Sequence, residues 1–187
     1  MRIAIILGSI RTGRQSHKVA HYLQKELEKR TITVDLIDLL HYFLPMMEER
    51  TSRLPNPPAV VTEVAAKLKA ADGIILITPE YHGSYSGVLK NALDYYLPEL
   101  SRKAIGLVTT SGGKLGGINA SIQLQQLVLS MGGYALPVKF LVPEVQLAFD
   151  EEYKPLHENV VKSATRFLDE YVWFAQAITT AKQQVAA

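Results

Sequence analysis

The sequence predicts an α/β protein whose parallel β-sheet lies between two layers of helices. Short apolar runs alternate with amphipathic helical patterns along the chain, the order expected of strands joined by helical crossovers. The runs are rich in β-branched residues and carry no polar face, as strands buried on both sides do. Gly/Ser-rich loops follow three of these runs. Because the carboxyl ends of parallel strands meet at one edge of a sheet, we expect the three loops to lie together.

The first strand, expected over residues 3–7, is followed by the loop GSIRTGRQS and then by a helical pattern. Free backbone N–H groups and the dipole at the start of a helix favour an anion. Ser9 and Ser16 add hydroxyl donors, and Arg11 and Arg14 add positive charge. We interpret this loop as a phosphate-binding loop. The alternative is a helix N-terminus with solvated basic side chains.

Two other kinds of phosphate loop are excluded by the same residues. A Walker A loop needs a lysine where Arg14 stands and a magnesium-binding hydroxyl where Gln15 stands. The dinucleotide fingerprint needs a second glycine where Ile10 stands, so that backbone can approach a pyrophosphate. Serines and an arginine suit a terminal monophosphate better.

The remaining elements follow in alternation. Further strands are expected over residues 33–39, 73–78, 104–110 and 136–142, and helices over residues 16–30, around 61–68, and over 88–97, 118–131 and about 160–174. Asp38, near the end of the second strand, is interpreted as an ordinary strand-end acid. The connection over residues 40–58 holds four prolines and is long enough to be functional or interfacial.

Five strands with this spacing fit a flavodoxin-like three-layer sandwich, a five-stranded parallel sheet of order 2-1-3-4-5. We expect a single domain over residues 1–187. In this order, ligands bind beyond the carboxyl ends of strands one, three and four, near the point where the strand order reverses. The three Gly/Ser-rich loops follow those three strands, which predicts one shared binding site.

Composition restricts the function. Nearly half the residues are apolar and the formal net charge is only +2, with no basic stretch interleaved with aromatics, so we expect no nucleic-acid partner. The absence of cysteine excludes disulfides, thiol nucleophiles and cysteine-ligated metals, and we expect no metal site. The first apolar run is too short for a signal peptide or a membrane span. We expect a cytoplasmic protein without a membrane partner.

Taken together, the three loops resemble the NAD(P)H-dependent FMN reductase family, a flavodoxin-like group that includes quinone, chromate and some azo-dye reductases. GSIRTGRQS is similar to the family's phosphate loop, and SGGKLGG (residues 111–117) is similar to its loop after strand four. TPEYHGSYSGVLKNALDY (residues 78–95) is similar to the family's PEYN…PGxLKNAxD segment and is the most specific signal. The resemblance covers residues 3 to about 142.

The resemblance implies FMN as the cofactor and a role for each matching residue. The FMN phosphate would be held by Ser9, Arg11, Gln15 and Ser16; the isoalloxazine would be bordered by Pro79, Glu80, Tyr81, His82 and Gly83; and its pyrimidine edge would be approached by Ser111, Gly112 and Gly113. His82 stands where the family often has Asn, and Ser86 where it often has Pro. A hydrogen-bonding His82 and a solvent-facing His82 both remain open.

The resemblance further implies an oxidoreductase in which NADPH or NADH passes a hydride through FMN to a small acceptor, by a ping-pong mechanism. No side chain is expected to act as a catalytic acid, base or nucleophile, because FMN carries the chemistry. The acceptor stays open among quinones, free flavin, chromate and azo compounds. The alternatives are a flavodoxin-type electron carrier and a nucleotide-binding module without redox activity.

We also expect a homodimer, or a dimer of dimers, with the site at the subunit junction. The connection at residues 41–58 carries Phe43, Leu44, Met46 and Met47, which look exposed. Tyr95 and Tyr96 lie beside core positions of their helix, and the last helix carries the only tryptophan, Trp173. Large apolar patches mark interfaces.

Overall fold

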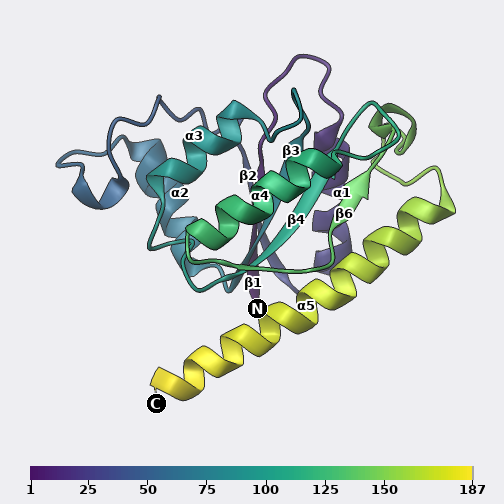
Figure 1. Cartoon of the computed structure of the whole chain (residues 1–187). Helices are drawn as coiled ribbons and strands as arrows, with labels where there is room; N and C mark the ends of the chain where they lie inside the picture. Colours follow the sequence, from purple (N-terminus) through teal and green to yellow (C-terminus); the bar gives the residue numbers. More distant parts are fainter. Residues whose placement is uncertain (187) are drawn as a thin grey trace.

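The computed structural model describes residues 1–186, which form a parallel sheet flanked by helices (Figure 1). The strands are β1 (Arg2–Leu7), β2 (Thr33–Asp38), β3 (Gly73–Pro79), β4 (Ala104–Thr110), β5 (Tyr134–Ala135) and β6 (Phe140–Val142). The helices are α1 (Ser16–Lys29), α2 (Ala59–Ala70), α3 (Gly87–Tyr95), α4 (Ile118–Ser130) and α5 (Glu158–Ala186), with short 3-10 helices η1 (Thr51–Arg53) and η2 (Val145–Leu147).

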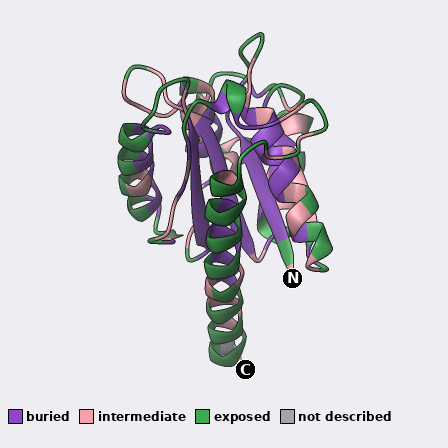
Figure 2. Cartoon of the chain, turned by 90° about the vertical axis from the view of Figure 1, so that its right-hand side faces the viewer, coloured by how far each residue is buried: buried purple, intermediate pink, exposed green. Residues whose placement is uncertain are grey.

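The strand order is β2-β1-β3-β4-β5, and β6 also pairs with β4. The predicted parallel order 2-1-3-4-5 is therefore confirmed. Side chains of successive residues in a strand point to opposite faces. Ile5 accordingly belongs to the core beneath α1 and α5, whereas Ile6 belongs to the core beneath α2, α3 and α4. Figure 2 shows the buried strands between helices whose outward faces are exposed, with the last part of α5 extending beyond the sheet.

The prediction of one fifth strand over residues 136–142 was wrong in its bounds. Two short strands replace it: β5 pairs with Ala104 and Ile105 at the start of β4, and β6 pairs with residues 108–110 at its end. Pro137 lies in the gap between them and has no N–H group to donate to the ladder. The interruption still leaves β6 ending beside β4, at the edge where the loops gather.

The long connection after β2 is anchored to α3. Asn91 donates a hydrogen bond from Nδ2 to the Pro45 carbonyl and accepts one at Oδ1 from the Met47 N–H, both at 2.8 Å. Leu44 is buried, so the expectation that it lies exposed was wrong, whereas Phe43 and Met46 are indeed exposed.

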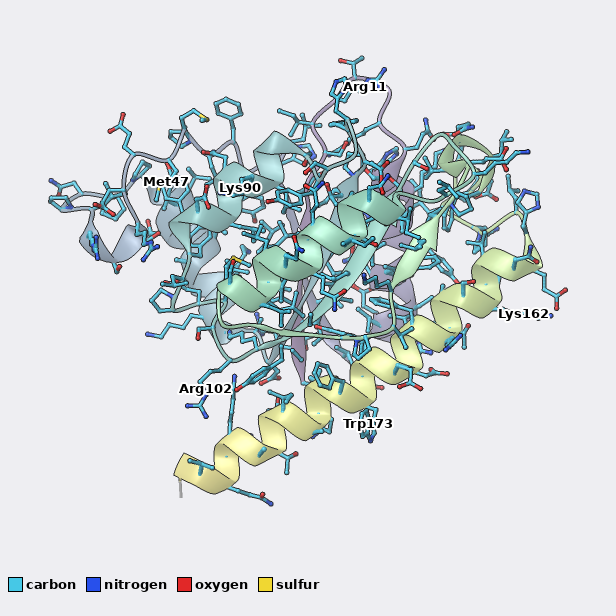
Figure 3. The ribbon with its side chains drawn as sticks, viewed as in Figure 1. Arg11, Met47, Lys90, Arg102, Lys162 and Trp173 are labelled. Carbon is cyan, nitrogen blue, oxygen red and sulfur yellow. The ribbon has the colours of Figure 1, made fainter. Side chains whose placement is uncertain are left out.

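Two further corrections concern the aromatic residues of α3 and the segment after it. Tyr95 and Tyr96 are only 3% and 1% exposed, because the chain covers both of them itself. The Tyr95 hydroxyl donates to the Pro45 carbonyl, and the Tyr96 hydroxyl donates to the Val61 carbonyl. Trp173 is 67% exposed and points away from the sheet (Figure 3).

None of the helices in residues 1–186 is both long enough and apolar enough to cross a membrane.

The end of β2 is tied to the loop after β1 by a largely buried ion pair. Arg14 donates to both carboxylate oxygens of Asp38, at 2.6 and 2.5 Å, and also to the Ser9 carbonyl at 2.5 Å. The two side chains are only 12% and 8% exposed. Two interpretations therefore change: Asp38 is more than a strand-end acid, and Arg14 braces the loop, since its guanidinium faces Asp38 and Ser9.

This arrangement shifts the titration of Asp38. Burial alone raises the pKa of its carboxyl. The hydrogen bonds from Arg14 and the Leu40 N–H, with the positive charge of Arg14, outweigh burial and hold that pKa below its ordinary value of 3.8. The folded protein thus favours the ionised form more strongly than the unfolded chain does.

We expect the substitution Asp38→Asn to lower the free energy of unfolding by about 3 kcal/mol at pH 7, because it leaves a buried guanidinium without its counter-charge. A lowered folded-state pKa contributes stability above the unfolded-state pKa and loses it as the pH falls. The difference between wild type and variant should therefore be full at pH 6–7 and shrink below roughly pH 4. Urea unfolding at several pH values measures it.

Asp35→Asn is the matched control, because it removes the same charge from the same strand. Its partner Arg2 lies 2.9 Å away with a side chain that is 45% exposed. Exposed pairs contribute about 0–1 kcal/mol. Equal losses in the two variants would contradict the bracing role of the Arg14–Asp38 pair.

Candidate functional site

A cavity of about 300 Å³ lies where the loops after β1, β3 and β4 meet. Nine of the twelve residues predicted from the sequence line it, namely Ser9, Arg11, Gln15, Ser16, Pro79, Glu80, Tyr81, Ser111 and Gly112. His82, Gly83 and Gly113 are outside the lining, although His82 directly follows Tyr81 and Gly113 directly follows Gly112, which belong to it. The parallel sheet thus brings three distant segments of the chain together as predicted.

The β1 loop leaves the sheet in a close turn. Gly8 donates its N–H to the Ile77 carbonyl, and a Cβ atom on Gly8 would lie 2.7 Å from Leu89 Cβ. Only glycine fits there without displacing α3. The loop then runs to Ser16, the first residue of α1. Arg11 lies near its tip and is exposed (Figure 3).

The Ser16 hydroxyl is buried in the site without a hydrogen-bond partner among residues 1–186. Ser16 is 1% exposed, and its Oγ has no hydrogen-bond partner within the described residues. A buried polar group left without a partner carries a desolvation penalty. At the start of α1 a bound anion would satisfy both this hydroxyl and the free N–H groups of the first turn. The geometry therefore fits a phosphate group.

The outer side of α1 is covered by the segment at residues 150–155. Lys18 forms an ion pair with Glu151 at 2.7 Å, and the ring of His21 stacks on Tyr153 with centroids 4.7 Å apart. Burial, followed by the charge of Arg14, lowers the pKa of His17 below its ordinary value of 6.5, which favours the neutral form of this imidazole.

The β3 loop forms a two-residue hairpin. Tyr81 and Ser84 exchange backbone hydrogen bonds of 2.8 and 3.0 Å. His82 and Gly83 between them have φ values of 51° and 74°, as a type I′ turn requires. Both Asn and His tolerate this left-handed backbone better than most residues. His82 thus occupies an Asn-like backbone position, is exposed, and lies at the tip of the turn.

Ser86 joins the first two loops. Its hydroxyl donates to the Gly8 carbonyl at 2.6 Å and accepts the Leu89 N–H as the N-cap of α3. Ser86 is 2% exposed. A proline at this position could make neither side-chain contact, so the departure from the family motif adds a polar link between the two loops.

The β4 loop offers open backbone. Ser111 donates its N–H to the Val142 carbonyl, and its hydroxyl donates to the Gly113 carbonyl at 2.9 Å. A Cβ atom on Gly113 would meet nothing within 4 Å, and one on Gly112 would meet only Gln146, at 3.7 Å. This open space beside main-chain groups suits the edge of a planar ligand.

Six residues line the cavity without having been predicted as site residues: Thr12, Gly13, Arg14 and Thr110, which lie within or beside the predicted loops, and Val145 and Gln146, which lie outside all three. Val145 and Gln146 belong to η2, which follows β6 at the same edge of the sheet. The Val145 N–H donates to the Ser111 carbonyl at 3.1 Å, and Gln146 Nε2 donates to the Gly112 carbonyl at 3.4 Å. No local motif marks them. Their place follows only from the pairing of β6 with β4.

A larger cavity of about 510 Å³ lies between β6 and the first turns of α5. Its lining is mostly apolar and includes none of the twelve predicted residues. We place the functional site in the smaller cavity, because the three loops and the unpartnered Ser16 hydroxyl meet there. Among residues 1–186, no three or more His, Cys, Asp or Glu side chains gather in a way that could hold a metal ion.

The chain is similar in sequence to known azoreductases. It is 31% identical over 175 residues to an NADPH azoreductase of Bacillus sp. (strain OY1-2), covering 91% of this chain and 94% of the relative. It is also 31% identical over 179 residues to an FMN-dependent NADPH-azoreductase of Staphylococcus aureus (strain USA300), covering 93% and 95%.

Solved structures agree with the fold. The flavoenzyme NAD(P)H:(acceptor) oxidoreductase FerB from Paracoccus denitrificans has a TM-score of 0.80 and 26% identity, covering 94% of this chain and 97% of that one. A flavodoxin from the domain Archaea has a TM-score of 0.61 at 12% identity, covering 95% and 99%, a likeness of fold alone. The flavodoxin-like fold is thereby confirmed.

The sequence model of the family described as NADPH-dependent FMN reductase matches residues 1–146. This range contains all three loops that surround the cavity. The resemblance drawn from the motifs is confirmed: the chain belongs to the NADPH-dependent FMN reductase family.

Proposed function

We propose that this protein is an FMN-dependent oxidoreductase that takes a hydride from NADPH or NADH and passes it to a small acceptor. The observation that carries the proposal is the buried, unpartnered Ser16 hydroxyl at the start of α1, within a cavity lined by all three family motifs. Relatives named NADPH azoreductases favour NADPH as the donor and azo compounds among the acceptors. Quinones, free flavin and chromate are the other acceptor classes.

The residues divide the work of binding FMN. Ser9, Arg11, Gln15 and Ser16 would hold its phosphate; Pro79, Glu80, Tyr81, His82 and Gly83 would border its ring; and Ser111, Gly112 and Gly113 would face its pyrimidine edge. FMN supplies the redox chemistry when bound, accepting and returning a hydride. The protein then needs to bind and orient, without a catalytic acid, base or nucleophile.

A homodimer, or a dimer of dimers, would complete the site. Ile118 and Ile122 are 40% and 49% exposed on α4, whose first turn contacts Glu80 at the cavity. Phe43 and Met46, 73% and 79% exposed, add apolar surface on the connection after β2. Exposed apolar surface of this extent favours a subunit interface. A second copy packed on α4 would lie beside the hairpin that borders FMN.

We expect Arg11→Ala to weaken FMN binding about ten- to a hundredfold, because a charge-assisted contact contributes about 1.5–3 kcal/mol. The quenching of FMN fluorescence during titration measures the affinity. Arg166→Ala is the control, an exposed arginine on α5 away from the cavity. Unchanged affinity in the Arg11 variant would show that Arg11 does not contact the phosphate.

We expect ping-pong kinetics, because one open site must serve donor and acceptor in turn. Initial rates measured at several fixed acceptor concentrations should give parallel double-reciprocal lines. A panel of quinone, azo dye, chromate and free flavin, each with NADPH and NADH, would also identify the preferred pair. Intersecting lines would demonstrate a ternary complex and contradict a mechanism in which donor and acceptor use one site in turn.

Light scattering at micromolar concentration should give at least twice the chain mass of 20.8 kDa. Ile122→Lys should shift the protein toward monomer and reduce its turnover, because a charge in an apolar interface is costly to desolvate. Val161→Lys is the control, since Val161 is 39% exposed on the distant α5. A wild-type monomer with full activity would refute the proposal that two subunits form the site together.

A further inference from the structure

The hairpin of residues 81–84 contains one residue, His82, in a strained backbone conformation. His82 adopts a left-handed φ of 51°, which L-residues avoid because Cβ approaches the following carbonyl. Such residues persist only where surrounding contacts over-determine the backbone. The hairpin itself supplies only the two backbone bonds between Tyr81 and Ser84. Additional contacts must therefore hold the turn.

One side chain of α4 supplies them. Gln123 accepts the Ser84 hydroxyl at Oε1 over 2.6 Å and donates from Nε2 to the Gly83 carbonyl over 2.8 Å. A carboxamide offers an acceptor on one side and donors on the other, so both bonds form at once. The bond from Gln123 thereby fixes the Gly83 carbonyl in an orientation toward α4.

The opposite end of the segment is fixed by the same helix. The Glu80 carboxylate accepts the Ala120 N–H at 3.0 Å and the Asn119 side-chain amide at 3.4 Å. A carboxylate at a helix start is stabilised by the helix dipole. The first two turns of α4 therefore hold the segment both before and after its turn, at Glu80 and at Gly83–Ser84.

Two backbone N–H groups of the turn are left without a backbone acceptor in the part of the chain that the structure describes. Within the described residues, the backbone N–H groups of His82 and Gly83 make no hydrogen bond to another backbone group. They sit directly after Tyr81, which lines the cavity. A fixed turn would present these donors in one direction to the edge of a bound ring. A mobile turn would not.

We infer that Gln123 is a positioning residue for the flavin: its two hydrogen bonds hold the His82–Gly83 turn so that the turn's N–H donors meet the ring. The inference rests on the proposed function. Gln123 lies outside the three family motifs and outside the cavity lining, yet it would set the orientation of backbone donors that bind FMN.

The test compares Gln123→Met, which keeps the side-chain volume but neither bond, with Gln126→Met, an exposed glutamine three residues later on α4. The dissociation constant of FMN should rise about three- to tenfold in Gln123→Met and stay unchanged in Gln126→Met. Combining Ser84→Ala with Gln123→Met should not raise the dissociation constant of FMN further, because the hydrogen bond between the two side chains is already lost.

Two more measurements separate positioning from mere stabilisation. In the FMN-free protein, hydrogen exchange at the Ser84 amide should become faster in Gln123→Met. In the loaded protein, weaker donors at the ring should disfavour the reduced state by a further three- to tenfold. That factor corresponds to a midpoint potential more negative by about 14–30 mV for a two-electron couple. A loss of global stability alone would also speed the exchange of core amides and would leave the midpoint potential unchanged.

The outcomes distinguish the two claims. Wild-type protein that binds no FMN would overturn the proposed function and, with it, this role of Gln123. FMN binding with the same affinity and the same potential in Gln123→Met and wild type would overturn this inference alone. Faster Ser84 exchange together with a shifted potential, absent from Gln126→Met, would establish it.

Discussion

The site depends on β1, a strand buried on both faces and hydrogen-bonded on both sides. Residues 3–7 are at most 1% exposed. Leu7 pairs in register with Asp38 of β2 and with Ile77 of β3, so the ends of three strands are set level with one another. The loop that begins at Gly8 can then only emerge at the shared carboxyl edge. Burial of apolar side chains in both cores is what makes this register costly to change.

Polar contacts between neighbouring loops turn that edge into a shaped cavity. The Arg14–Asp38 pair ties the first loop to β2, and Ser86 ties it to α3. Glu80 and Gln123 tie the β3 segment to α4. Ser86 and Gln123 lie outside the cavity lining, whereas Arg14 and Glu80 belong to it. The division suits an enzyme whose cofactor carries the reaction, because binding groups must be held still while the reacting edge stays open.

Sequence patterns predicted what depends on periodicity and on local motifs. The apolar runs located four of the strands closely, and the three Gly/Ser-rich loops located the cavity. The fifth strand was misplaced, because an apolar run around Pro137 does not reveal where strand pairing stops. Leu44, Tyr95 and Tyr96 looked uncovered, because the sequence does not show that Asn91 folds the long connection back onto α3.

Long-range side-chain pairs lay beyond sequence reasoning for a related reason. Arg14 resembled a phosphate ligand and Asp38 an ordinary strand end, since 24 residues separate the partners that meet in the fold. Gln123 lies 39 residues from Ser84, inside an unremarkable helix, and Gln146 lies 34 residues from Gly112. Such contacts follow from the strand order and not from spacing along the chain.

The central claim is that the start of α1 binds the phosphate of FMN. Parallel titrations of the purified protein with FMN and with riboflavin, which lacks the phosphate, test it most directly. FMN should bind at least about a hundredfold more tightly, since buried Ser16 and exposed Arg11 would both contact the phosphate. Equal affinities for FMN and riboflavin would contradict it.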